Sequence, residues 1–170
     1  MSKLMIFGYG ECGKDTAASL IGEQLDLTWE SSSFFAANHF IFDSLKHING
    51  YNSVEECFQD RRNHRAAWFN LIREYNEDNK AKLAQNIYET HDIYVGMRCR
   101  EELREVKRTV NPFCLWIDAE ERVGLECGGS CTVGIDQADC IIQNNGTPEE
   151  FKEKLIKFCN FCSTWGLAKL

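Results

Sequence analysis

The feature that most constrains the fold is a glycine-rich loop between a strand and a helix at the start of the chain. Residues 3–7 are a short apolar run that predicts a β-strand. Residues 8–14 then fit the pattern G-x-x-x-x-G-K. Residues 15–25 carry apolar side chains at helical spacing, at Ala17, Ala18, Leu20, Ile21 and Leu25. A strand, a loop of this spacing and a helix predict a phosphate-binding loop; the alternative is a plain glycine turn.

Elementary electrostatics explains why this pattern suits phosphate. Glycines let the backbone curl so that several N–H groups face one anion, and the helix adds its positive end. Lys14 supplies a full charge for the outer phosphates. The residues expected to hold the donor phosphates are Gly8, Gly10, Glu11, Cys12, Gly13, Lys14, Asp15 and Thr16. Asp15 stands where the common pattern has Ser or Thr, so the Mg²⁺ contact stays open between Asp15 and Thr16, mainly through water.

The Gly13-Lys14-Asp15-Thr16 ending resembles the nucleoside monophosphate kinases, and most closely the deoxynucleoside monophosphate kinases of tailed phages. A second segment, residues 139–151, is similar to the same phage kinases, in which its turn lies beside the donor base. The resemblance therefore implies Asn145 and Gly146 as donor-site residues; the alternative is an ordinary turn. The resemblance extends from residue 3 to about residue 160.

Residues 93–98 form a β-rich run that ends in Gly96 and Arg98. In the family that the chain resembles, an arginine at this strand end touches the acceptor phosphate, which implies the same role for Arg98. The acidic residue that often precedes that arginine in the family is missing here. The alternative is that Arg98 caps the next helix.

An arginine cluster, Arg61, Arg62, Arg65 and Arg73, accompanies a predicted helix with Trp68 on its apolar face. One or two of these guanidinium groups could reach an acceptor phosphate, and the alternative is a solvated helix face. The acceptor pocket is expected between Ser33 and Tyr75. Its candidate residues, with Arg98, are Ser33, Phe34, Arg65, Trp68 and Arg73. Trp68 either stacks on a base or packs in the core.

Five short strands alternating with helices predict one α/β domain over residues 1–170 with a parallel sheet. Residues 28–35 are expected to form the second strand, and residues 113–117 a buried one. By resemblance, the fold is a three-layer α/β/α phosphate-loop kinase fold with strand order 2-3-1-4-5. It implies an acceptor-binding helical insertion at about 36–90 and a short lid at about 119–134. Arg122 is the lid arginine, unless it pairs with a nearby glutamate.

Composition narrows the partners. The net charge of −7 disfavours nonspecific nucleic-acid binding. No apolar run approaches a membrane span and no signal peptide is visible, so we expect a cytoplasmic protein, in the host cytoplasm if phage-encoded. The sequence does not determine the oligomeric state, and a homodimer is one of the alternatives.

The nine cysteines indicate thiols in a reducing compartment. Cys159 and Cys162 form C-x-x-C, and Cys127 and Cys131 lie four apart, so the four thiols could bind zinc. The alternative is buried apolar cysteine, because Cys159 and Cys162 fall on the buried stripe of a helix.

The function that the sequence predicts is transfer of the γ-phosphate of ATP to a deoxynucleoside monophosphate with Mg²⁺, to give ADP and dNDP. Lys14, Arg98 and Arg122 would neutralise the transferring group. One alternative is a phosphate-loop kinase of another small molecule, such as dephospho-coenzyme A. Another is a noncatalytic nucleotide-binding module, although the Asn-Lys-x-Asp motif of a GTPase switch is absent.

Overall fold

A parallel β-sheet lies at the centre of the protein, seen here in a computed structural model that describes residues 3–124 and 131–164. Within those residues the sheet has five strands in the order β2-β3-β1-β4-β5, and every pairing is parallel. The strands are β1 (Leu4–Phe7), β2 (Trp29–Ser31), β3 (Ile93–Val95), β4 (Phe113–Asp118) and β5 (Cys140–Gln143). The predicted fold class and strand order are confirmed. Ile6 of β1 lies between Val95 and Leu115.

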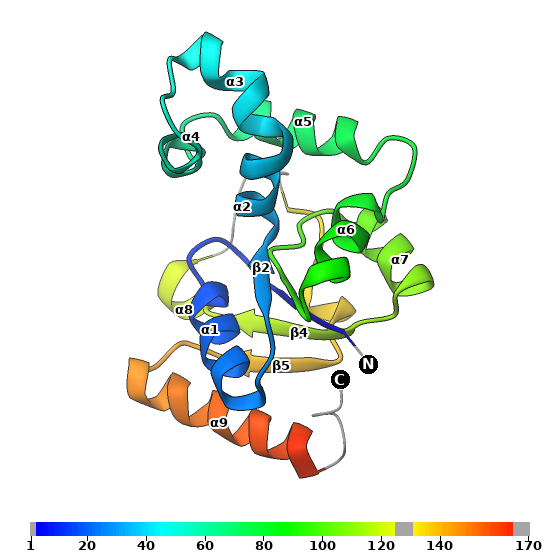
Figure 1. The fold of residues 1–170 in the computed structure, drawn as a ribbon. Helices are drawn as coiled ribbons and strands as arrows, with labels where there is room; N and C mark the ends of the chain where they lie inside the picture. Colours follow the sequence, from blue (N-terminus) through cyan, green and yellow to red (C-terminus); the bar gives the residue numbers. More distant parts are fainter. Residues whose placement is uncertain (1–2, 125–130, 165–170) are drawn as a thin grey trace.

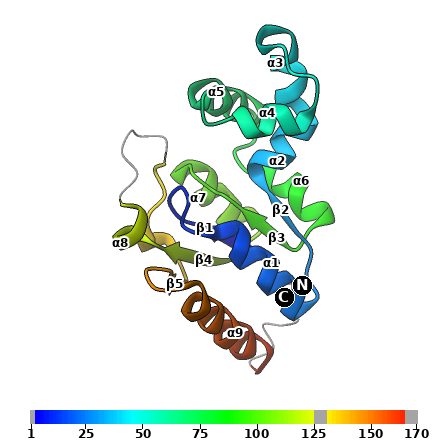
Figure 2. The ribbon, with the colours of Figure 1, turned by 90° about the vertical axis from the view of Figure 1, so that its left-hand side faces the viewer.

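Helices cover both faces of the sheet, which produces the three-layer arrangement that was predicted. α1 (Lys14–Leu25) and α9 (Pro148–Thr164) pack together over Leu4 and Ile6 on one face (Figure 2). α6 (Lys82–Thr90) and α7 (Arg100–Thr109) supply the apolar side chains over Met5 and Phe7 on the other. Because both faces are covered, all of β1 is buried, which explains its unbroken apolar sequence.

A separate group of helices projects beyond the sheet, at the end of the molecule far from α9 (Figure 1). This helical segment comprises α2 (Ser32–Ala36), a π-helical stretch η1 (Ala37–Ile41), α3 (Phe42–Asn49), α4 (Val54–Asp60) and α5 (Arg65–Tyr75). It has a small core of its own, formed by Ala36, Ala37, Ile41, Leu45, Cys57 and Trp68. The segment is joined to β2 at one end, so its helices stand beside the carboxyl edge of the sheet.

The second strand is shorter than the sequence predicted. β2 stops at Ser31, and residues 32–35, which were expected to continue it, are helical. The reason is a helix cap: the Ser31 Oγ accepts a hydrogen bond from the Phe34 amide at 3.0 Å. This early turn starts the helical segment directly at the strand end.

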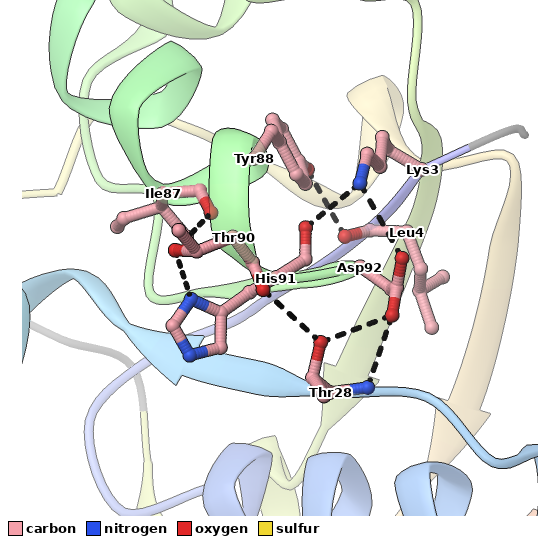
Figure 3. Close-up of polar contacts among 8 residues, drawn as sticks. All are labelled: Lys3, Leu4, Thr28, Ile87, Tyr88, Thr90, His91 and Asp92. Atoms are coloured by element: carbon pink, nitrogen blue, oxygen red, sulfur yellow. Dashed lines mark hydrogen bonds and ion pairs between the residues drawn. The ribbon is translucent and has the colours of Figure 1, made fainter.

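Polar side chains tie together the opposite, amino-terminal edge of the sheet (Figure 3). The Asp92 carboxylate accepts hydrogen bonds from the Thr28 amide (3.1 Å) and hydroxyl (3.0 Å), and it pairs with the Lys3 ammonium (3.3 Å). The Tyr88 hydroxyl donates to the Leu4 carbonyl at 3.0 Å. Burial raises the pKa of Asp92, but the hydrogen bonds from Thr28 and Lys3 outweigh it and the net pKa is lowered. This cluster joins the starts of β1, β2 and β3.

Two short elements complete the chain: α8 (Glu120–Val123) and a 3₁₀ turn η2 (Ile135–Gln137). The last helix, α9, begins with a capping box. The Thr147 hydroxyl accepts from the Glu150 amide at 3.2 Å, and the Glu150 carboxylate accepts from the Thr147 amide at 2.8 Å.

In residues 3–124 and 131–164, no helix is long and apolar enough to cross a membrane.

Of the thiols considered for zinc, the three that the structure describes do not gather at one place. Cys159 and Cys162 are buried in the core between α9 and the sheet, and burial raises the pKa of each to about 11. Cys131 packs against the core on the other face, and Cys127 lies outside the described residues. No group of three potential metal ligands occurs in the described part of the chain. Cys159 and Cys162 therefore fit the buried apolar alternative.

Candidate active site

The glycine loop, residues 8–14, curls at the carboxyl end of β1. Gly8 has φ = +152° and Gly13 has φ = +96°, both in the region that favours glycine. A Cβ atom on Gly8 would lie 2.5 Å from the Ile117 carbonyl oxygen, and one on Gly13 would lie 2.7 Å from the Asn144 amide nitrogen. Both glycines are therefore required, because the loop is pressed against β4 and the turn after β5.

Two side chains far away in the sequence hold this loop. The buried Asn144 donates from Nδ2 to the Cys12 carbonyl at 2.9 Å. Arg122 donates to the carbonyls of Glu11 (3.1 Å) and Asn144 (3.2 Å). Sequence reasoning chose Asn145 and Gly146 instead of Asn144, and it placed Arg122 at the transferring group. In the structure, Arg122 braces the loop from behind and does not line the cavity described below.

Lys14 lies over its own loop. Its ammonium group donates to the carbonyls of Tyr9 (2.6 Å) and Gly8 (3.2 Å), and α1 begins at this residue. The first-turn amides of a helix have no partners within the helix, so they can bind an anion. Lysine charge, curled backbone and helix end therefore converge on one place, as the motif predicted.

A cavity of about 470 Å³ extends from this loop to the helical segment. Its loop side is formed by Gly10, Glu11, Gly13, Lys14, Asp15 and Thr16. The opposite wall comes from α4 and α5, and the floor comes from the ends of β2 and β3 and the start of α7. The volume is in the range of small-molecule sites. Gly8 and Cys12, also predicted to bind phosphate, support the loop from within: Cys12 is 1% exposed.

The cavity is more basic than the chain as a whole. Among the described residues, its cationic lining consists of Lys14, Arg61, Arg62, Arg65, Arg73, Lys80 and Arg98. Its carboxylates are Glu11, Asp15, Glu101 and Glu102. A protein with a net charge of −7 thus carries a cationic surplus where the predicted ligands would bind. This distribution favours an anionic ligand.

Five of the predicted acceptor residues line this cavity together: Ser33, Arg65, Trp68, Arg73 and Arg98. The sixth, Phe34, packs edge-on against Phe58 at 5.2 Å and is not part of the lining. Trp68 is 5% exposed; it belongs to the small helical core and also lines the cavity. Its indole N–H is buried without a partner among the described residues.

The floor of the cavity holds a buried carboxylate that the sequence analysis did not single out. Glu102 is 8% exposed. Burial raises its pKa, while a hydrogen bond from the Asn76 side chain and the charge of Lys80 oppose that rise. The neighbouring Tyr94 hydroxyl also has a raised pKa, first from burial and then from the Glu102 charge. Only the fold reveals this polar floor, since helical periodicity alone gives no sign of it.

The described end of the expected lid lies beside Arg98. The Thr132 amide donates to the Arg98 carbonyl at 2.8 Å, and Arg100 pairs with Asp136 at 3.2 Å. Residues 125–130, the middle of the expected lid, lie outside the described residues. The lid therefore stays a prediction.

The loop offers oxygen ligands of the kind that Mg²⁺ uses. The Asp15 and Thr16 side chains follow Lys14 in the first turn of α1, and both residues line the cavity. Mg²⁺ usually keeps several waters and binds one or two protein oxygens together with substrate phosphates. One carboxylate and one hydroxyl fit that requirement.

Comparison with known proteins bears on the fold. No protein-family model matches the chain, and no curated protein sequence matches it significantly. A shikimate kinase from Bacteroides thetaiotaomicron aligns over 95% of this chain and 98% of its own, with a TM-score of 0.53 and 10% identity. A sugar kinase from Janibacter is less similar, with a TM-score of 0.49 and 13% identity over 94% of this chain and 95% of its own. A shikimate kinase from Aquifex aeolicus is also less similar, with a TM-score of 0.48 and 12% identity over 96% of this chain and 99% of its own. The chain therefore shares the α/β fold of the Bacteroides thetaiotaomicron shikimate kinase.

Proposed function

We propose that the protein is a deoxynucleoside monophosphate kinase that catalyses ATP + dNMP ⇌ ADP + dNDP. The observation that carries the proposal is the single cavity that joins the glycine loop to Arg98 and the arginines of the helical segment. A kinase of this type needs two anionic nucleotides brought together with their phosphates facing each other. The resemblance of the glycine loop and of residues 139–151 to phage kinases supplies the substrate class.

On the donor side, the glycine loop and the first turn of α1 would hold the triphosphate, with Lys14 on its outer phosphates. Lys14 would exchange the two carbonyls that it now contacts for phosphate oxygens. Asp15 or Thr16 would hold Mg²⁺, mainly through water, and the ion would supply charge neutralisation. Asn145 and Gly146 would border the base through the turn that Asn144 anchors.

On the acceptor side, the helical insertion at 36–90 would form the pocket, with Arg98 and either Arg65 or Arg73 on the acceptor phosphate. Those phosphate oxygens are already anionic, so no general base is required, and alignment with charge stabilisation is sufficient. Trp68 and Glu102 lie further in, where a base or sugar would be bound. Closure of the lid at 119–134 would exclude water. Arg122 would act directly on the transferring group only if it left the two carbonyls that it holds.

A second candidate is a kinase of another small anion. The cationic lining is compatible with it, because such a lining selects for an anion and does not distinguish a nucleotide from another anion. A panel of acceptors separates the two proposals. All common dNMPs and NMPs, modified phage nucleotides, dephospho-coenzyme A and shikimate would each be incubated with ATP and Mg²⁺, and ADP would be measured. The first proposal expects turnover with one or more dNMPs; turnover only with a non-nucleotide would overturn it.

Two variants test the assigned roles. Lys14→Ala should lower turnover by a factor of about 10² or more while circular dichroism stays unchanged, because the lysine charge acts on the transferring phosphates. Arg98→Ala should lower kcat/KM for the acceptor while ATP binding persists. Near-normal turnover by Lys14→Ala would refute the assigned donor site.

A further inference from the structure

One ion pair crosses the cavity between the helical segment and the glycine loop. Arg62, in the turn between α4 and α5, places its guanidinium group 2.7 Å from the Glu11 carboxylate. The two side chains are 60% and 63% exposed, so water screens the pair and its net stabilisation is small. An interaction of this kind is easily exchanged for a stronger one.

The neighbouring Arg61 is held more firmly. Its guanidinium group lies 3.9 Å from the centre of the Phe58 ring, and it donates to the Phe58 carbonyl at 2.7 Å. Burial lowers the pKa of Arg61, Arg62 lowers it further, and Asp15 opposes both. Arg61 therefore lies within electrostatic reach of Asp15 in the first turn of α1. Arg61 and Arg62 both line the cavity together with the glycine loop, where outer phosphates would bind.

Arg122, which the sequence predicted at the transferring phosphate, makes its contacts elsewhere. Arg122 holds the Glu11 and Asn144 carbonyls, behind the loop. Glu11 is consequently held at two points: Arg122 binds its backbone and Arg62 binds its side chain. Of these two arginines, only Arg62 lines the cavity.

We propose that Arg62, supported by Arg61, binds the terminal phosphate of a nucleoside triphosphate, and that the Glu11 carboxylate occupies Arg62 when no triphosphate is bound. The triphosphate is the ligand that the proposed function assigns to the loop, and the inference rests on it to that extent. Arginine binds phosphate through two parallel, charge-assisted hydrogen bonds, which are stronger than a screened pair with an exposed carboxylate. Phosphate charge next to Glu11 also repels the carboxylate, so the exchange of partners is favoured from both sides.

The test measures ATP and ADP binding by titration calorimetry with Mg²⁺ and without an acceptor. Arg62→Met should weaken ATP binding by about tenfold and leave ADP binding within about twofold, because only ATP carries the terminal phosphate. Arg62→Lys, which keeps the charge but loses the planar fork, should fall between. Glu11→Gln should tighten ATP binding by about threefold, and this gain should disappear when combined with Arg62→Met.

Arg108→Met is the matched control. Arg108 is another exposed arginine paired with a glutamate, Glu105, but on α7 and outside the cavity. Its removal should leave both affinities unchanged.

Equal weakening of ATP and ADP by Arg62→Met, or no weakening of either, would overturn the proposal. Weaker ATP binding by Glu11→Gln would also overturn it. Suppose that the wild type binds ATP and that Arg62→Met weakens this binding as expected, but that none of the tested acceptors leads to formation of ADP. This result would refute the kinase proposal and support the present one. Failure of the wild type to bind ATP would refute both.

Discussion

Asn144 provides a sharp test of how the glycine loop is held. Its Nδ2 donates to the Cys12 carbonyl at 2.9 Å, across 132 residues of sequence, and the side chain is 8% exposed. Asn144→Ala removes this donor, so the buried Cys12 carbonyl loses the hydrogen bond that it accepts from Asn144. A buried group left unpaired costs about 1–3 kcal/mol. For a chain of 170 residues, each kcal/mol shifts the unfolding midpoint by about 2–4 °C.

At high pH, Asn144→Asp should destabilise the protein more than Asn144→Ala does. An ionised carboxylate cannot donate to the Cys12 carbonyl, and its charge would be buried beside a carbonyl oxygen. Burial raises the pKa of such a carboxyl, and the protonated form can donate. The loss of stability should therefore be greatest above that raised pKa and should shrink as pH falls through it.

Thermal unfolding followed by circular dichroism at pH 8 and pH 5 measures both effects, and calorimetry with ATP measures the consequence for the loop. Asn38→Ala is the matched control, because the Asn38 side chain also donates to a backbone carbonyl, that of Phe34 at 3.1 Å, but in solvent. It should change the free energy of unfolding by less than about 0.5 kcal/mol. If Asn144→Ala behaves like Asn38→Ala and ATP affinity is unchanged, the contact does not hold the loop.

Three further predictions concern other parts of the structure. Asp92→Asn should destabilise the fold by about 1–2 kcal/mol at pH 7, since the charge-assisted hydrogen bonds from Thr28 and Lys3 are weakened. The pKa of Asp92 is lowered in the fold, so the difference from wild type should be complete above pH ~4 and disappear as pH falls through that lowered pKa, in acid unfolding titrations. Glu102→Gln should raise the unfolding midpoint at pH 8, because burial disfavours the ionised carboxyl, and the gain should shrink as pH falls through its raised pKa. The same variant should weaken acceptor turnover; a lower midpoint at pH 8 would show that the charge is well solvated. Gly96→Ala should cost about 1–2 kcal/mol in chemical denaturation, since φ is +103° and a Cβ would lie 2.9 Å from the Ser32 hydroxyl.

Local patterns were sufficient where the physics is local. The spacing of Gly8, Gly13 and Lys14 identified the loop, because loop curvature involves residues a few positions apart. Buried strands were recognisable as short apolar runs. The end of β2 was missed because Ser31 belongs to a pattern of three serines that is compatible with either a strand end or a helix cap. Strand order came from family resemblance and was confirmed by the pairing of β1 with β3 and β4.

The sequence by itself indicated that a glycine loop of the anion-binding pattern stands between the first strand and helix, and that arginines follow it in two places. Only the tertiary structure decided what each of those charges faces. Arg122 turned out to brace the loop, Arg62 to meet Glu11 across the cavity, and Glu102 to be buried at its floor. The contacts of Arg122 and Arg62 join residues 111 and 51 positions apart. The order of the strands, not the spacing along the chain, sets such distances, so no periodicity in the sequence records them.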